Sequence, residues 1–117
     1  MEIRNDENTL IETVTALAGL KIEIWTGDFQ HALEGHPEVT LDRIKAALKR
    51  PGQIVQSKKS ARACLFYSIG IKDATLGTIY FCVVAGVTEP GKGKFEIAYE
   101  ANFMKNGTVL FQKGETK

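Results

Sequence analysis

The run of residues 78–85 constrains the fold of this chain more than any other feature of the sequence. Its residues, Thr-Ile-Tyr-Phe-Cys-Val-Val-Ala, are apolar at nearly every position, so the run lacks the alternation of a strand with one solvated face. A short, continuous run of this kind, rich in β-branched and aromatic residues, is typical of a strand that is buried on both faces. The run therefore predicts the central strand of a sheet.

Other segments show the alternation or the β-branched content of strands. They cover residues 9–16, 20–25, 53–57, 62–69, 95–100 and 108–111. Gly19 separates the first two, which predicts an N-terminal hairpin, although Leu10, Val14 and Leu17 would also suit a helix. Breaker residues predict loops at 70–76 and 89–93.

Two short helices are predicted between the N-terminal strand pair and the remaining strands. Thr26 is a plausible N-cap of the first, and Gly35 fits the position with positive φ just past its end. Pro37 or Thr40 lies near the start of the second helix, which ends before Pro51. Its apolar stripe is expected to be buried and consists of Leu41, Ile44, Ala47 and Leu48.

The order of these elements predicts an α+β fold, in which the two short helices pack on an antiparallel, meander-type sheet of four or more strands. The chain has 117 residues, enough for one hydrophobic core, so we expect a disordered tail at 1–8 and a single domain at 9–113. The start of the chain lacks the apolar core of a signal peptide, and no run is long enough to cross a membrane. We expect a cytoplasmic protein in which Cys64 and Cys82 stay reduced.

Charge is distributed unevenly although the formal net charge is only +1. Residues 1–38 hold eight acids and two bases, whereas residues 43–62 hold seven bases and no acid. The basic block is either a patch that faces phosphate or a solvated helix face followed by a charged hairpin tip.

The stretch 31–39, His-Ala-Leu-Glu-Gly-His-Pro-Glu-Val, carries both histidines of the chain at the joint between the helices. Their spacing does not match a zinc motif, and the two cysteines lie in separate strands, so we expect no metal and no cofactor. The Gly91-Lys-Gly93 segment lacks the Walker pattern. General acid–base catalysis remains as a candidate role for the two histidines, because imidazole can take or give a proton near neutral pH. The alternative roles are a structural cap for His36 and an exposed helix position for His31.

Taken in order, several of these features resemble one protein superfamily. His31, four intervening residues, His36-Pro37-Glu38, a helix ending at Pro51, an aromatic strand around Phe66 and Tyr67, and a closing Ala98-Tyr99 follow one another over residues 20–101. This layout resembles the phage and mobile-element members of the barnase–EndoU–colicin–RelE (BECR) superfamily of metal-independent ribonucleases. The chain departs from that pattern at Ile97, where the family motif has threonine.

The resemblance implies a BECR-like domain that cleaves RNA as a small, toxin-type endoribonuclease. It implies RNA as a partner, with an antitoxin or immunity protein as a second partner and no membrane association. The implied catalytic residues are His31, His36, Arg62, Tyr67 and Tyr99, and the implied RNA-binding residues are Lys58, Lys59, Arg62 and Arg50. The alternative, favoured by Ile97 and the near-neutral charge, is a catalytically inactive module of the same fold that binds RNA or a protein.

Overall fold

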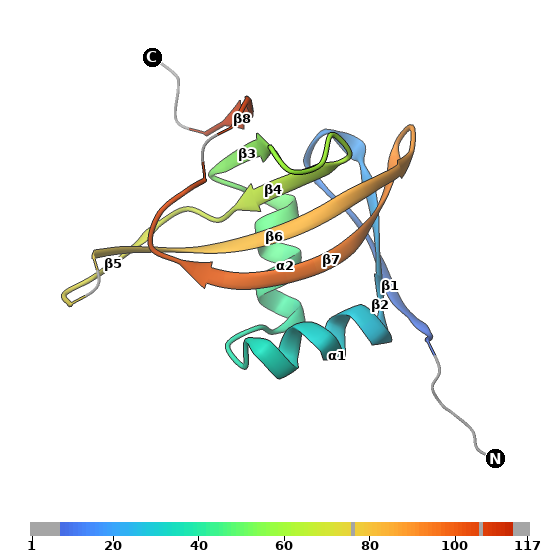
Figure 1. Cartoon of the computed structure of the whole chain (residues 1–117), viewed down its shortest axis with the longest axis horizontal. Helices are drawn as coiled ribbons and strands as arrows, with labels where there is room; N and C mark the ends of the chain where they lie inside the picture. Colours follow the sequence, from blue (N-terminus) through green and yellow to red (C-terminus); the bar gives the residue numbers. More distant parts are fainter. Residues whose placement is uncertain (1–7, 76, 106, 114–117) are drawn as a thin grey trace.

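The computed structural model describes residues 8–75, 77–105 and 107–113. Within this part of the chain, strands and helices follow one another in an α+β arrangement (Figure 1). In chain order they are β1 (Leu10–Thr15), the 3-10 helix η1 (Leu17–Gly19), β2 (Lys21–Trp25), α1 (Thr26–Gly35), α2 (Leu41–Lys49), β3 (Gln53–Gln56), β4 (Ala63–Tyr67), β5 (Ile71–Asp73), β6 (Gly77–Glu89), β7 (Lys92–Ala101) and β8 (Val109–Gln112).

The β6 strand lies at the centre of the sheet, whose strand order is β1-β2-β7-β6-β4-β3-β8. It pairs antiparallel with β4 on one side and with β7 on the other. Phe81 and Val83 are buried toward the helices, whereas Cys82 is buried on the opposite face. The prediction that residues 78–85 form a central buried strand is therefore confirmed. We call the face toward the helices the inner face and the opposite one the outer face.

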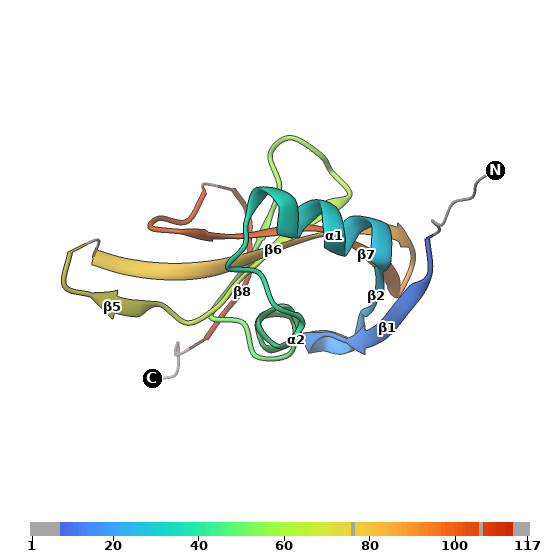
Figure 2. The same ribbon diagram turned by 90° about the horizontal axis from the view of Figure 1, so that it is seen from below.

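The two helices cover the inner face because each presents an apolar stripe to it. From α2, Ile44, Ala47 and Leu48 are buried as predicted, and Ala32 of α1 joins the same core. The α1 helix lies beside β7, whereas α2 crosses behind β6 and β4 (Figure 1). Figure 2 shows α2 on one side of the β6–β7 layer and the loop between β3 and β4 on the other. Neither α1 nor α2 thus lies over the outer face.

The prediction of a purely antiparallel meander is wrong. The sheet is mixed, because β2 pairs parallel to β7, with Ile22 opposite Gly93. The last strand, β8, pairs with β3 rather than with β7, which precedes it in the chain. Alternation of apolar residues reveals which face of a strand is buried, but it does not determine which strand lies beside it. The predicted N-terminal hairpin is confirmed, with β1 antiparallel to β2.

The helix boundaries agree with the sequence in part. Thr40 is the N-cap of α2, as predicted, and its Oγ1 accepts a hydrogen bond of 3.1 Å from the Arg43 amide. Thr26, however, is the first residue of α1, and Trp25 is the N-cap. Gly35 ends the helix without positive φ, since only Gly19, Gly77 and Gly91 have positive φ among the glycines of the described residues. His36 caps α1 instead, because its amide donates to the Ala32 carbonyl at 2.8 Å.

Three further features complete the fold. The predicted loop at 70–76 contains the short strand β5, which pairs with the start of β6. Residues 1–7 of the predicted tail lie outside the described residues, but Asn8 accepts a hydrogen bond of 2.9 Å from the Gly27 amide. Within the described ranges, no helix has the length and apolar composition needed to cross a membrane.

Candidate functional site

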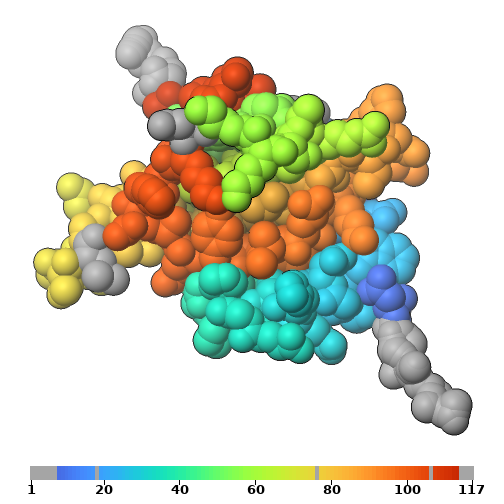
Figure 3. Space-filling view, in the orientation of Figure 1, coloured from blue at the N-terminus to red at the C-terminus, as the bar shows by residue number. Residues whose placement is uncertain are grey.

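The outer face of the sheet carries a hollow of about 710 Å³, which we call the outer hollow. Strand residues make its floor, and two segments that are distant in sequence make its walls. The floor includes Val55, Leu65, Val84 and Tyr99, and the walls are the loop after β3 and the segment after β7. Figure 3 views this face, with the loop in light green and the second segment in red.

The first wall is a well-defined loop that presents Lys58 and Lys59. The Gln56 side-chain amide donates to the carbonyls of Ser60, Ala61 and Ala63 at 3.2, 2.8 and 3.1 Å. The Ser57 hydroxyl accepts hydrogen bonds from the amides of Lys59 and Ser60. Both lysines are exposed, and neither forms an ion pair with any described residue. The loop therefore holds two exposed cations at the rim of the hollow, which Glu96 also lines.

A third lysine, from the second wall, and a histidine, from the joint between α1 and α2, lie near one aromatic ring. The His36 ring centroid lies 5.7 Å from that of Tyr99, with an interplanar angle of 43°. The Lys105 ammonium lies 5.8 Å from the centroid of the same Tyr99 ring. His36 reaches this position because the joint between α1 and α2 lies beside β7. A base and a cation thus meet at one tyrosine, and its side chain forms part of the floor of the outer hollow.

Glu38 fixes the histidine from the side of the helix joint. Its Oε2 lies 3.5 Å from Nδ1 of His36 and accepts a hydrogen bond of 3.1 Å from the Glu100 amide. Arg43 completes the network, donating to the Glu100 carboxylate at 2.7 Å and to the Glu38 carbonyl at 3.3 Å. Burial acts to raise the pKa of Glu38. The Glu100 amide and the charges of His36 and Arg43 outweigh burial and hold the pKa of this carboxyl below its ordinary value.

The lowered pKa of Glu38 makes part of the stability depend on pH. A carboxyl whose pKa is lower in the folded state contributes stability above the unfolded value, and this contribution is lost as pH falls through the folded value. Glu38→Gln keeps an acceptor for the Glu100 amide but removes the charge, so we expect a loss of about 1 kcal/mol at pH 7. Thermal melts should show the difference from wild type shrinking below pH 4.5 and vanishing in stronger acid; a constant difference would contradict the assignment.

Two tyrosines and a cysteine lie together on the outer face. Burial raises the pKa of Tyr67 to about 12 and the pKa of Cys82 to about 11, and it also raises the pKa of Tyr99. The Tyr67 hydroxyl accepts a hydrogen bond of 2.9 Å from the Lys105 amide. These groups are therefore neutral at pH 7, and Tyr67 positions the segment that carries Lys105. Cys64 and Cys82 are both free thiols, and burial raises the pKa of Cys64 as well.

No protein-family model, no curated protein and no solved structure matches this chain. The ground for assigning a function is therefore the arrangement of side chains on the outer face. Among the residues that the structure describes, no group of three or more His, Cys, Asp or Glu residues could hold a metal ion.

Part of the predicted site lies in or beside the outer hollow. Tyr99, Lys58 and Lys59 line it. Tyr67 is buried in the same outer cluster that Tyr99 packs against, and His36 does not line the hollow but lies against the Tyr99 ring. His31 is exposed on α1, and neither it nor Arg62 lines the hollow. Arg62 lies in the turn before β4 and is exposed, whereas Ala63, the first residue of that strand, does line the hollow.

Two other residues differ from the sequence-based assignment. Arg50 lines the hollow beside α2 and not the outer hollow. Lys105 was missed because it follows the last strand of the motif, where no local pattern marks it.

Proposed function

We propose that this chain is a small endoribonuclease that binds single-stranded RNA in the outer hollow and cleaves it without a metal ion. The observation that carries the proposal is that His36 and Lys105 both contact the ring of Tyr99, at one side of a hollow rimmed by lysines. A metal-independent ribonuclease needs a base for the 2′-hydroxyl, an acid for the 5′-oxygen, and cations for the phosphate. These residues supply all three.

The rim and floor of the hollow suit a single strand rather than a duplex. Lys58, Lys59 and Lys105 offer three point charges for phosphates. Tyr99 and Phe103 offer aromatic faces, and the Phe103 side chain is 60% exposed. Bases stack on such rings only when they are unpaired, and a positively charged groove with aromatic side chains is the usual design for binding single strands.

The proposed reaction moves one proton at each end of the scissile phosphate. Glu38 beside Nδ1 of His36 favours a proton on that nitrogen, which leaves Nε2 free to accept the 2′-hydroxyl proton. The 2′-oxygen forms a bond to phosphorus, and the bond from phosphorus to the 5′-oxygen breaks. The 5′-oxygen takes a proton from the Lys105 ammonium. The products are a 2′,3′-cyclic phosphate and a 5′-hydroxyl, and no co-reactant is consumed.

A second candidate is a binding module of the same fold that does not cleave RNA. It is favoured by His31 and Arg62 lying outside the outer hollow and by Ile97 in place of the motif threonine. RNA binding would then depend on the lysines alone, with no cyclic phosphate formed.

The rim lysines and Arg62 give the first test of the proposal. Lys59→Ala should weaken binding of a single-stranded RNA and reduce the slope of log affinity against log salt by about 0.7, the contribution of one phosphate contact. Arg62→Lys should leave binding and cleavage unchanged. For each variant, RNA binding is measured by fluorescence anisotropy at two salt concentrations, and cleavage is measured in EDTA with analysis of the product ends. If Lys59→Ala matches wild type at both salt concentrations, the rim does not contact phosphate.

A further inference from the structure

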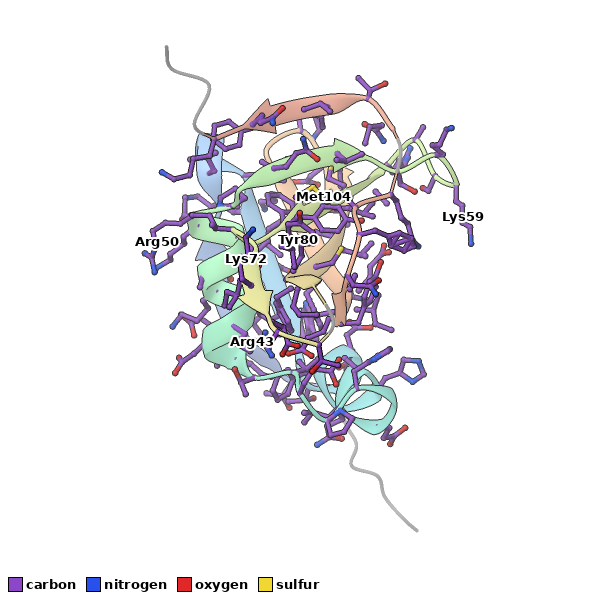
Figure 4. All side chains as sticks on the ribbon, turned by 90° about the vertical axis from the view of Figure 1, so that its left-hand side faces the viewer. Arg43, Arg50, Lys59, Lys72, Tyr80 and Met104 are labelled. Carbon is purple, nitrogen blue, oxygen red and sulfur yellow. The ribbon has the colours of Figure 1, made fainter. Side chains whose placement is uncertain are left out.

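Two further hollows adjoin the outer hollow along one side of the molecule. An end hollow of about 480 Å³ shares Met104 with the outer hollow. The end hollow also shares Ser68, Ile69, Gly70 and Lys113 with a helix-side hollow of about 570 Å³ beside α2. Figure 4 views this side and shows Met104 and Tyr80 between Lys59, toward the outer face, and Arg50, toward α2. The three hollows thus adjoin one another around the end of the sheet, and we call the series of them the groove.

Cations from distant parts of the chain follow this groove. Lys113 lies where the end hollow meets the helix-side hollow, and Lys49 and Arg50 line the latter at the end of α2. Arg43 also lines it, but its guanidinium is held by Glu100 and by the Phe81 ring at 4.4 Å. Among the described residues that line the end and helix-side hollows, none is acidic. The two hollows beyond the outer hollow therefore carry positive charge, which comes from Lys113 at their junction and from Lys49 and Arg50 beside α2.

The floor of the groove indicates which anion fits. Tyr80 lies in the end hollow with its ring against the edge of Tyr67, at a centroid distance of 6.2 Å, and Ile69 is 53% exposed. An aromatic ring held at the floor of a basic groove suits an unpaired base. A duplex is too stiff to bend around the end of a sheet within a few base pairs, whereas a single strand turns freely.

We infer that the substrate is a single-stranded RNA long enough to run from the outer hollow around the end of the sheet to α2. This inference rests on the proposed function and deepens it, since it assigns Lys113, Arg50 and Lys49 to a binding track outside the reaction site. Affinity should then depend on the length of the RNA, while the chemistry at His36 should not.

The experiment uses 2′-O-methyl RNA oligonucleotides, which lack the nucleophilic hydroxyl, of about 4 and about 12 nucleotides, within the range of single-strand grooves. The longer one should bind wild-type protein more tightly. Lys113→Ala/Arg50→Ala should weaken the longer oligonucleotide roughly tenfold and lower its salt slope by about 1.4, at about 0.7 per phosphate contact. The same variant should bind the shorter one like wild type. The matched control is Lys21→Ala/Lys92→Ala, which removes two exposed lysines paired in register between β2 and β7.

The outcomes separate this inference from the proposed function. If both lengths bind wild type equally, or if the two variants weaken the longer one equally, the extended track is wrong and the outer hollow still stands. If neither length binds, the proposed function fails. Poly-L-glutamate of matched charge is tested in the same way. If Lys113→Ala/Arg50→Ala loses binding of this polymer but keeps binding of the RNA, the groove is a docking surface for an acidic protein.

Discussion

Val83→Asp should remove the folded state. Val83 lies in β6 at the centre of the sheet, it is 0% exposed, and it packs in the inner core between β4 and β7. A carboxylate there loses its hydration, and among the described residues no polar or charged side chain is buried in the core to replace it. Such burial costs several kcal/mol, which is comparable with the whole stability of a small domain. Circular dichroism during heating should show no cooperative transition, or one far below that of wild type.

Two further variants test whether the effect of Val83→Asp comes from burying a charge or from any substitution in β6. Val83→Ala removes two methyl groups without adding charge and should cost about 2 kcal/mol while keeping a cooperative melt. Thr88→Asp places the same charge at an exposed position of the same strand and should melt like wild type. An unchanged melting midpoint in Val83→Asp would mean that the centre of β6 is not buried.

His36→Ala should lower RNA cleavage by 10²–10⁴-fold, the usual contribution of a general base. The imidazole is 38% exposed, so the variant removes a reactive group without opening a cavity in the core. Binding of RNA should change little, because the lysines of the rim remain. The reaction is followed in EDTA by the appearance of 2′,3′-cyclic phosphate ends, and the melting temperature of the variant is measured alongside.

His31→Ala is the matched control, since it removes the second histidine of the chain from an exposed position on α1. It should cleave like wild type. The cleavage rate of Glu38→Gln should lie between those of His31→Ala and His36→Ala, because this variant keeps His36 but weakens the preference for a proton on Nδ1. Equal background activity in wild type and His36→Ala would show that the chain does not cleave RNA by this route and would favour the binding module.

The sequence predicted the parts of the fold that depend on local patterns. The apolar run of β6 and the periodicity of α2 each come from a continuous segment, and both were confirmed. The β5 strand was missed because Ile71-Lys-Asp73 is too short to show alternation. The parallel partner of β2 could not be predicted, because it is set by how the whole chain packs.

For the candidate site, too, the sequence revealed residues that are close in the chain but not contacts made between distant segments. His36 and Glu38 lie two residues apart, so the sequence could show them together, and the structure places them in contact. Arg62 was predicted from the resemblance and from its place in the basic block, but it lies in the turn before β4 and does not line the hollow. Lys105 joins the site only because the segment after β7 folds back over Tyr67, and no spacing in the sequence reports that contact.

The parallel pairing of β2 with β7 has a consequence for synthesis in the cell. β2 leaves the ribosome before both helices and the strands β3 to β6, whereas β7, its parallel partner in the sheet, follows all of them. Contacts between segments so far apart in sequence form slowly, because a long loop must close before they stabilise the chain. Until β7 has been made, the edge of β2 lacks its partner strand, and residues such as Ile22 and Ile24, which are buried in the folded protein, lack part of their cover. The nascent chain is therefore most exposed to aggregation and proteolysis during this interval.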